Sequence, residues 1–185
     1  MKWTEYNNYF EEILQNTNPK APYDNPDFLD YTKMNQTRNK RWMKHGEIIP
    51  SIIETVGKIA KAQHWILITE PWCGDAAHSV PFINLISELN DNIQLEIQLR
   101  DSNSEIEKYL TNGGKSIPIL VIRNENGKDL AVWGPRPAAC QLIFNELKLA
   151  GAEFSELKIG LQNWYNNDGG VGLQEELNEL LKTIL

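Results

Sequence analysis

Apolar residues recur every three to four positions along the first third of the chain, which is the spacing of helices that bury one face. The pattern predicts a helix over 3–14, a second over 30–45 that ends at Gly46, and a third over 48–59. Three proline steps between 18 and 26 separate the first two helices, because a residue that precedes proline avoids the helical conformation.

The pattern changes period in the middle of the chain. Strict alternation of apolar and polar residues over 93–100 is typical of a strand, and the short apolar run over 64–70 is typical of a buried strand. Further along, Asn126-Gly127 predicts a hairpin turn between two more strands. The expected elements are a strand, a helix, a strand, a short helix, a hairpin and a helix, over 64–70, 82–89, 93–100, 103–111, 117–133 and 137–147.

Two more apolar stripes follow at the end of the chain, separated by a break at 167–170. The chain therefore divides into an N-terminal helical extension (1–62) packed on the core, an α/β core (63–150) and a C-terminal helical extension (151–185). We expect the three parts to form one compact domain.

Composition narrows the class of protein. The chain has 185 residues, of which 41% are hydrophobic and 23% charged, as is ordinary for a globular protein. No apolar run approaches the ~18–20 residues that a membrane helix needs. The net charge of −7 argues against binding to nucleic acid or to anionic membranes. The N-terminal segment is amphipathic and acidic, unlike a signal peptide.

Cysteine usage points to a reducing compartment. The two cysteines, Cys73 and Cys140, lie far apart in the sequence, as expected of a cytoplasmic protein whose thiols stay reduced. Together with three histidines they offer no recognisable ligand spacing, so no metal site is expected.

One turn carries candidate chemistry. Trp72, Cys73, Gly74 and Asp75 lie between a buried strand and a helix, and the positive end of a helix stabilises the thiolate form of a cysteine. The negative charge of Asp75 opposes this effect, and His78, one turn further on, is a candidate to supply a proton. We expect Cys73 to be partly exposed, with a pKa modestly below its ordinary value of about 8.5.

These residues resemble the active-site motif of the thioredoxin family, WCxxC, which reads Trp72-Cys73-Gly74-Asp75-Ala76 here. Pro81 matches the proline that kinks the helix after that motif, and Ser116-Ile117-Pro118 matches the segment with the family's cis-proline. The strand, Asn-Gly turn, strand and Gly134 that follow also agree, so the resemblance covers about residues 63–150. It implies a thioredoxin-like α/β fold, with a central mixed sheet of about four strands flanked by helices and with extra helices at both termini.

Two residues depart from the family pattern. Ala76 replaces the second cysteine, and Leu67 stands where the family often has a buried acid. The chain therefore has an attacking thiol without the neighbouring resolving thiol that dithiol chemistry requires. Cys140 is either a helix-packing residue or a distal resolving thiol. An engineered cysteine-to-alanine trap would have the same residue at position 76.

The resemblance also implies a substrate groove beside Pro118, where the backbone of Ile117 pairs with an extended peptide or with glutathione. The loop that starts at Gly134 is expected at the same end of the sheet. There Gly134 leaves room for a substrate backbone, and Arg136 binds a ligand carboxylate or steadies the Cys73 thiolate. The expected substrate-binding residues are Trp72, Gly74, Ile117, Pro118, Gly134 and Arg136.

Functions of different kinds fit these residues. As an enzyme, the protein is a monothiol thiol–disulfide oxidoreductase, in which Cys73 attacks a protein disulfide or a glutathione mixed disulfide. A second thiol, from glutathione as co-substrate, from a thiol protein or from Cys140, then releases the product. As a binding module, the fold holds extended peptides or a partner protein beside Pro118 without catalysis. As an assembly subunit, it uses the helical extensions for self-association. No bound cofactor is expected.

Overall fold

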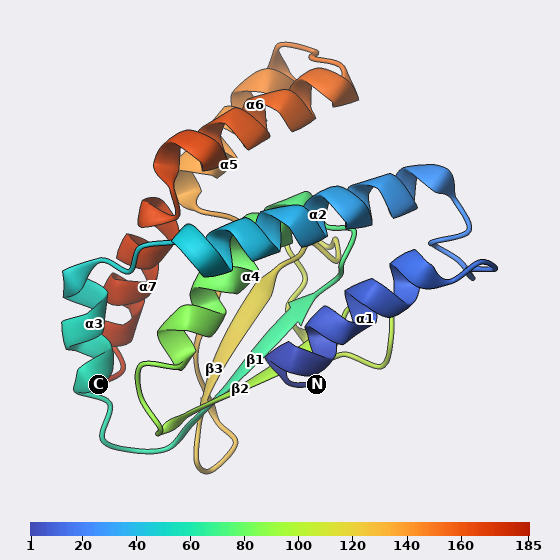
Figure 1. The fold of residues 1–185 in the computed structure, drawn as a ribbon. Coiled ribbons are helices and arrows are strands. Elements are labelled where there is room, and N and C mark those ends of the chain that lie inside the picture. Colours follow the sequence, from blue (N-terminus) through green and yellow to red (C-terminus); the bar gives the residue numbers. More distant parts are fainter.

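The computed structural model describes residues 1–185 and has a four-stranded mixed β-sheet at its centre (Figure 1). The strands lie in the order β2-β1-β3-β4, with bounds Gln63–Thr69 for β1, Ile93–Leu99 for β2, Ile119–Asn124 for β3 and Asp129–Trp133 for β4. β1 pairs in parallel with β2 and antiparallel with β3, and β3 pairs antiparallel with β4. The predicted α/β class, with a mixed sheet and a central first strand, is confirmed.

Both faces of the sheet are covered. Neighbouring side chains of a strand point to opposite faces, yet Ile66 and Leu67 on β1 and Leu120 and Val121 on β3 are all at most 1% exposed. Burial on both faces explains why β1 and β3 consist of long apolar runs. In β2, apolar and polar residues alternate instead.

Seven α-helices flank the sheet: α1 (Trp3–Gln15), α2 (Pro26–His45), α3 (Pro50–Gly57), α4 (Gly74–Ser87), α5 (Ala138–Leu149), α6 (Phe154–Asp168) and α7 (Val171–Lys182). α2 runs alongside α4 in the same direction. Asn35 Nδ2 donates to the Pro71 carbonyl oxygen at 2.9 Å. Two turns further along α2, Trp42 Nε1 donates to His78 Nδ1 at 3.0 Å. The N-terminal segment therefore packs along the helix that follows the WCGD turn.

The second helix begins earlier than predicted. It starts at Pro26 rather than near residue 30, because proline is tolerated in the first helical turn, where its missing N–H would have no partner. The side chain of Asn25 caps this end by accepting a hydrogen bond from the backbone N–H of Asp27 at 2.9 Å.

The predicted helix over 103–111 is wrong. Only a single 3₁₀ turn forms there, Ile106–Lys108. Side chains bind the neighbouring backbone instead: the Ser104 hydroxyl donates to the Arg100 carbonyl at 2.8 Å, and the Gln98 side-chain oxygen accepts from the Glu105 N–H at 3.1 Å. Such local hydrogen bonds offer the backbone an alternative to the helix.

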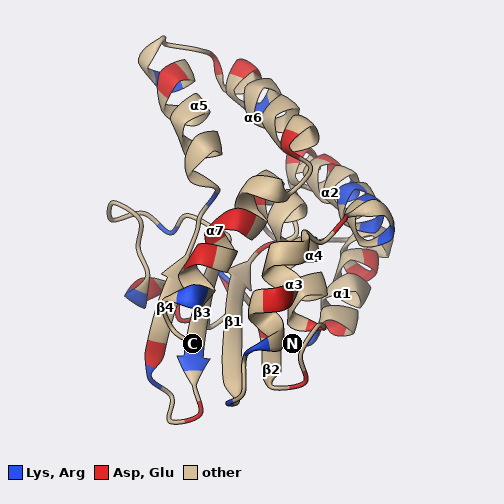
Figure 2. Cartoon of the chain, turned by 90° about the vertical axis from the view of Figure 1, so that its left-hand side faces the viewer, with Lys and Arg blue, Asp and Glu red and all other residues tan.

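The end of the chain leaves the sheet and returns to it. α5 and α6 form a hairpin that projects from the body, and α7 returns to pack against α3 (Figure 1). Basic side chains gather on α2, whereas α7 carries acidic ones (Figure 2).

Candidate functional site

Cys73 lies directly before α4, in the turn that follows β1. Its thiol donates a hydrogen bond to the Ile117 carbonyl oxygen, with 3.4 Å between the two atoms. The peptide bond between Ile117 and Pro118 is cis. The fold thus brings two segments 44 residues apart in sequence together at one end of the sheet, with the cysteine at a helix N-terminus.

The expected exposure and pKa of Cys73 are both wrong. The residue is only 7% exposed. Its burial, with the neighbouring charge of Asp75, raises the pKa of the thiol to about 12. The backbone N–H groups of Ala76 and Asp75 and the charge of Arg136 act in the opposite direction but are outweighed. Burial disfavours the charged form more strongly than the helix N-terminus stabilises it, so the net change in the pKa of Cys73 is upward.

Arg136 reaches the same turn but binds the protein's own carboxylate. Its Nη2 donates to Asp75 Oδ2 at 2.6 Å, and the two side chains are only 13% and 12% exposed. Tyr165 donates to the other carboxylate oxygen at 2.9 Å, and Arg136 also stacks over the ring of Phe144 at 4.5 Å. The sequence analysis assigned this charge either to a ligand carboxylate or to the Cys73 thiolate. Its ion pair is with Asp75, and its charge also acts to lower the pKa of the Cys73 thiol.

Gly134 lies against the Pro118 segment, and this neighbour is part of the chain. A Cβ atom at Gly134 would come within 2.2 Å of the Pro118 carbonyl oxygen, and its φ of +128° is a conformation that other residues avoid. The space that the sequence analysis reserved for a substrate backbone is thus occupied by the neighbouring loop.

His78 is held away from the thiol. Its Nδ1 accepts from Trp42 Nε1 at 3.0 Å, its Nε2 lies 3.2 Å from the Gln162 side-chain oxygen, and its ring stacks on Tyr165. Burial lowers the pKa of His78 to about 4. The imidazole is therefore neutral at physiological pH and joins α2, α4 and α6, and none of its hydrogen bonds reaches Cys73.

Residues of the N-terminal segment wall the site, and the sequence analysis did not identify them. The Phe28 ring meets Trp72 edge-on, with 5.5 Å between centroids, and Asn35 binds the Pro71 carbonyl. On its other side Trp72 carries the Arg100 guanidinium, 4.6 Å from the ring centroid. Apolar periodicity predicted the helices but gave no sign of which aromatic side chain would meet which segment.

A buried acid was also missed. Glu70 is 4% exposed and ends the apolar run before the WCGD turn. Burial raises the pKa of its carboxyl, and one oxygen accepts from the Asp101 N–H at 3.0 Å. The sequence analysis looked for this acid only at position 67, which is leucine. A charged residue next to a buried strand was the signal that could have found Glu70.

Cys140 is completely buried in the first turn of α5 and is a free thiol. Burial and the nearby charge of Asp75 raise its pKa to about 12. No hydrogen bond joins it to Cys73, although both cysteines lie close enough to feel Asp75.

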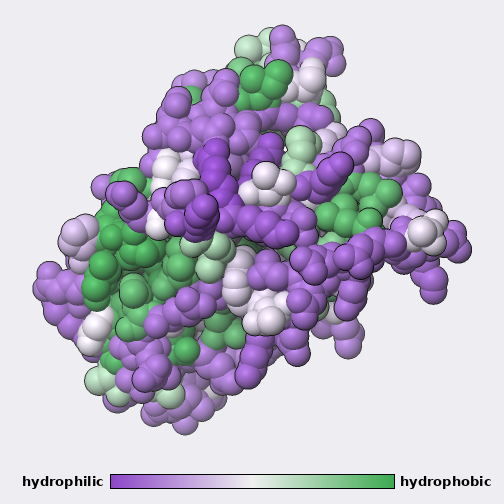
Figure 3. All heavy atoms as spheres, viewed as in Figure 1, coloured by the Kyte–Doolittle hydropathy of each residue, from purple (hydrophilic) through white to green (hydrophobic).

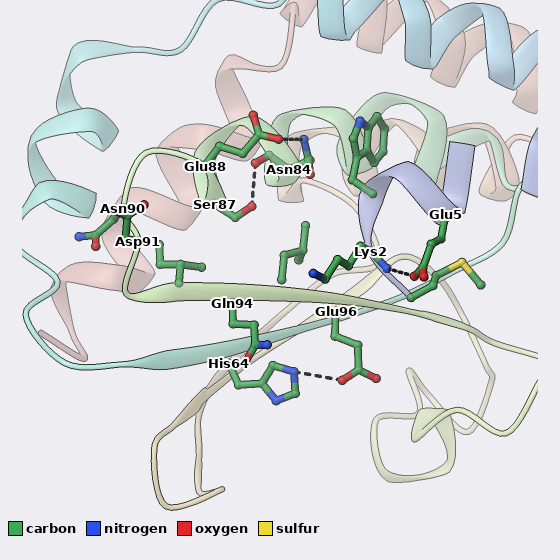
Figure 4. A pocket seen from close by; sticks show the side chains of 14 residues that line it. Lys2, Glu5, His64, Asn84, Ser87, Glu88, Asn90, Asp91, Gln94 and Glu96 are labelled. Atoms are coloured by element: carbon green, nitrogen blue, oxygen red, sulfur yellow. Dashed lines mark hydrogen bonds and ion pairs between the residues drawn. The ribbon is translucent and has the colours of Figure 1, made fainter. Parts of the chain in front are cut away.

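A polar groove lies at the other end of the sheet (Figure 4). Its volume is about 650 Å³, and it is bordered by the start of α1, the last turn of α4 and the edge strand β2. Polar side chains dominate it, including a His64–Glu96 pair at 3.1 Å. Since α4 begins beside Cys73 and ends at this groove, a helix of about 20 Å separates the two.

No cluster of three or more histidine, cysteine or acidic side chains is placed to hold a metal ion. None of the helices combines the length and the apolar character that crossing a membrane requires.

Comparison with known proteins shows which family this chain belongs to. The family model described as thioredoxin matches residues 23–148. The chain belongs to the thioredoxin family. The match begins within the N-terminal segment, so α2 and α3 are part of the thioredoxin-like region.

Two solved structures share the thioredoxin-like architecture. One is PA1234 from Pseudomonas aeruginosa, a protein of unknown function: it is 17% identical, the match covers 78% of this chain and 92% of that one, and the TM-score is 0.51. The other is an HIV epitope scaffold, 14% identical over 100% of both chains, with a TM-score of 0.58. No curated protein matches the sequence. These likenesses show the thioredoxin-like fold and nothing of activity.

Proposed function

We propose that this protein is a monothiol thiol–disulfide exchange protein that uses Cys73 as its nucleophile. The observation that carries the proposal is the position of Sγ, at the N-terminus of α4 and 3.4 Å from the carbonyl oxygen before Pro118. A disulfide that approaches this carbonyl would lie against the sulfur, and the helix end would stabilise the thiolate once it forms.

The exchange proceeds in two balanced steps. The Cys73 thiolate attacks one sulfur of a disulfide, so that a mixed disulfide forms with Cys73 and the other sulfur leaves as a thiolate and takes up a proton. A second thiolate then attacks the substrate sulfur of the mixed disulfide. A new disulfide forms between these two sulfurs, and the bond to Cys73 breaks, so that Cys73 leaves as a thiolate. No net oxidation of the protein results.

The second thiol comes from outside the chain in this proposal. Ala76 stands where a local resolving cysteine would be and is 1% exposed, while Cys140 is completely buried. Glutathione or a thiol protein is therefore the better resolving group, and both are abundant in the reducing cytoplasm to which we assign the protein.

Burial of Cys73 makes this chemistry slow until a substrate reaches the site. With a thiol pKa of about 12, the thiolate is a minor species at neutral pH. The substrate must displace part of the wall formed by Trp72 and Phe28, which meet edge-on beside the cysteine turn.

The same burial favours a second candidate, a non-catalytic binding module. In that case the groove beside Pro118 holds an extended peptide or a partner protein through backbone hydrogen bonds, and Cys73 is a packing residue.

Incubation with glutathione disulfide, followed by mass spectrometry of the intact protein, distinguishes the two. The first proposal predicts one glutathione adduct on the wild type and on Cys140→Ser, faster at higher pH, and none on Cys73→Ser. Added reduced glutathione should remove the adduct. An unmodified wild type at alkaline pH, combined with peptide binding that Cys73→Ser retains, would support the binding module instead.

A further inference from the structure

The most exposed large apolar side chains of the protein gather on one element. Leu142, Leu149, Phe154 and Ile159 are 62%, 89%, 68% and 61% exposed, more than any other large apolar residue, and all lie on the α5–α6 hairpin. The projecting end of the molecule accordingly shows apolar atoms at its surface (Figure 3). Scattered apolar residues need no explanation, but a concentration on one element marks an interaction surface.

The hairpin is also poorly buried as a whole. Among all residues of α5 and α6, only Cys140 and Tyr165 are buried. The two helices pack chiefly on each other and project beyond the sheet (Figure 1). A helical pair of this length obtains little stability from its own hydrogen bonds and depends on packing an apolar face. α6 contacts α2 and α4 through Gln162, Tyr165 and Asn166, whereas the outer face of α5 has no covering partner.

One stripe of α5 has the composition of a self-complementary surface. Leu142, Asn145, Glu146 and Leu149 are spaced at i, i+3, i+4 and i+7 and therefore share one face of the helix, and all four are exposed. The order along the stripe is apolar, two polar residues, apolar. Such a pattern matches its own reversed copy.

A two-fold axis between residues 145 and 146 gives this match. Two antiparallel α5 helices related by that axis place Leu142 opposite the second copy's Leu149, twice. They also place Asn145 opposite the second copy's Glu146, twice. Each apolar side chain then meets an apolar one, and each amide meets a carboxylate.

The hydrogen-bonding state of the polar pair fits this arrangement. Asn145 Oδ1 already accepts from Gln141 Nε2 at 2.8 Å, and its amide nitrogen donates to nothing within the chain. The Glu146 carboxylate makes no hydrogen bond or ion pair within the chain. The Asn145 amide nitrogen and the Glu146 carboxylate are therefore both free to bind. In the dimer, each Asn145 amide can donate to the Glu146 carboxylate of the second copy.

We propose that the exposed stripe of α5 is the contact surface of a homodimer, in which two copies pair antiparallel about a two-fold axis between Asn145 and Glu146. Phe154 and Ile159 lie on α6, the helix packed against α5. Gln141, the residue before Leu142, accepts from Arg136 at 3.2 Å and Arg136 binds Asp75, so hydrogen bonds link the start of α5 to the cysteine turn. The proposal does not depend on the chemistry of Cys73.

The size of the α5 contact surface limits the affinity of the dimer. α5 has 12 residues and is therefore about 18 Å long, too short to bury the roughly 800 Å² per partner of a stable interface on its own. We therefore expect a weak dimer that forms with rising protein concentration. Because each copy carries a net charge of −7, added salt should strengthen the dimer by screening the repulsion.

Sedimentation velocity of the full chain, over about 1 µM to 1 mM, tests the proposal. The wild type should shift from monomer to dimer, and Leu149→Asp should raise the dissociation constant at least about tenfold, since it puts an unpaired charge in the contact. Leu110→Asp, a matched change at a 42% exposed leucine outside the hairpin, should have no effect.

A charge pair tests the register. Leu142→Lys and Leu149→Glu should each weaken the dimer, whereas the doubly substituted chain should recover it, because each lysine then faces the second copy's glutamate. Circular dichroism checks that all variants fold. A wild type that stays monomeric at every concentration overturns the proposal and leaves the stripe to a different partner. A dimer that is insensitive to Leu149→Asp, or a double variant that does not recover, also overturns it.

Discussion

Arg136 Nη2 lies 2.6 Å from Asp75 Oδ2, and both side chains are almost fully buried. The two residues are 61 positions apart in the sequence, so their ion pair ties the loop after β4 to the first turn of α4. A buried ion pair forms only where its geometry repays the loss of hydration. Tyr165 contributes by donating to the second carboxylate oxygen. The pair therefore fixes the turn that carries Cys73 against the C-terminal helices.

Breaking this pair from one side should be costly. Arg136→Met leaves the Asp75 carboxylate buried with only the Tyr165 hydroxyl as a side-chain partner, and we expect the free energy of unfolding to fall by about 3–5 kcal/mol. Asp75→Asn combined with Arg136→Met should cost less than Arg136→Met alone, because no buried charge is left unpaired. Chemical denaturation of the two single variants and the double variant measures this. Costs that simply add would show that the two side chains do not stabilise each other.

The charges of Asp75 and Arg136 should also shift the pKa of Cys73, in opposite directions. Burial is the larger cause of the raised pKa and the charge of Asp75 the next, whereas Arg136 acts in the opposite direction. Asp75→Asn should therefore lower the thiol pKa and Arg136→Met should raise it. A change of one pKa unit alters the thiolate fraction at pH 8 about tenfold.

The rate of Cys73 alkylation against pH, in a Cys140→Ser background, measures this shift. Asp91→Asn, a change of the same charge beside the groove at the far end of α4, should leave the rate unchanged. If both site variants accelerated alkylation equally, loosening of the turn rather than charge would be the cause.

The backbone plan could be predicted from the sequence because it depends on local patterns. Alternation in β2, continuous apolar runs in β1 and β3 and the Asn126-Gly127 turn each specify an element by its own residues. The 3₁₀ turn at Ile106–Lys108 was not predictable in this way, because Ser104 and Gln98 compete for the backbone there.

The sequence located the cysteine turn and the Pro118 segment of the candidate site, but not its electrostatics or the residues that other segments bring to it. The motif located Cys73, and the spacing located Pro118, yet the sequence did not show that the thiol is buried, that it binds the Ile117 carbonyl, or that Phe28 meets Trp72 beside the turn. Which distant side chain meets which is set by tertiary packing. For the same reason Arg136 was assigned to a ligand carboxylate or to the Cys73 thiolate, and its ion pair with Asp75 was not predicted.

Gly134 should be irreplaceable for steric reasons. A methyl group there would meet the Pro118 carbonyl at 2.2 Å, and the φ of +128° is unfavourable for alanine. We expect Gly134→Ala to destabilise the fold by at least about 2 kcal/mol. Gly151→Ala is the matched control, because Gly151 also has a positive φ, +73°, but has open space around its Cβ position.

Thermal unfolding of the two glycine variants separates backbone strain from the clash. Equal losses of stability would mean that the close approach to Pro118 relaxes without cost. A larger loss for Gly134→Ala, accompanied by altered alkylation of Cys73, would show that the loop after β4 holds the Pro118 segment in place.

The buried His78 should make the protein sensitive to mild acid. In the folded state its pKa is lowered to about 4, first by burial, whereas the unfolded value is about 6.5. Between these values the unfolded chain binds the proton and the folded chain does not, so stability falls as the pH drops through this window. Above pH 6.5 this contribution to stability is fully present.

The linkage gives a loss of about 2 kcal/mol between pH 7 and pH 5. Protonation of Nδ1 would also remove the acceptor of the Trp42 indole N–H, 3.0 Å away. Urea unfolding at a series of pH values measures the slope, which should be smaller in His78→Gln, a variant that has no group titrating there. His45→Gln, at an exposed histidine on α2, is the control and should keep the wild-type slope. If His78→Gln retained the full slope, the acid sensitivity would belong to the carboxylates, and His78 would not be held neutral between Trp42 and Gln162.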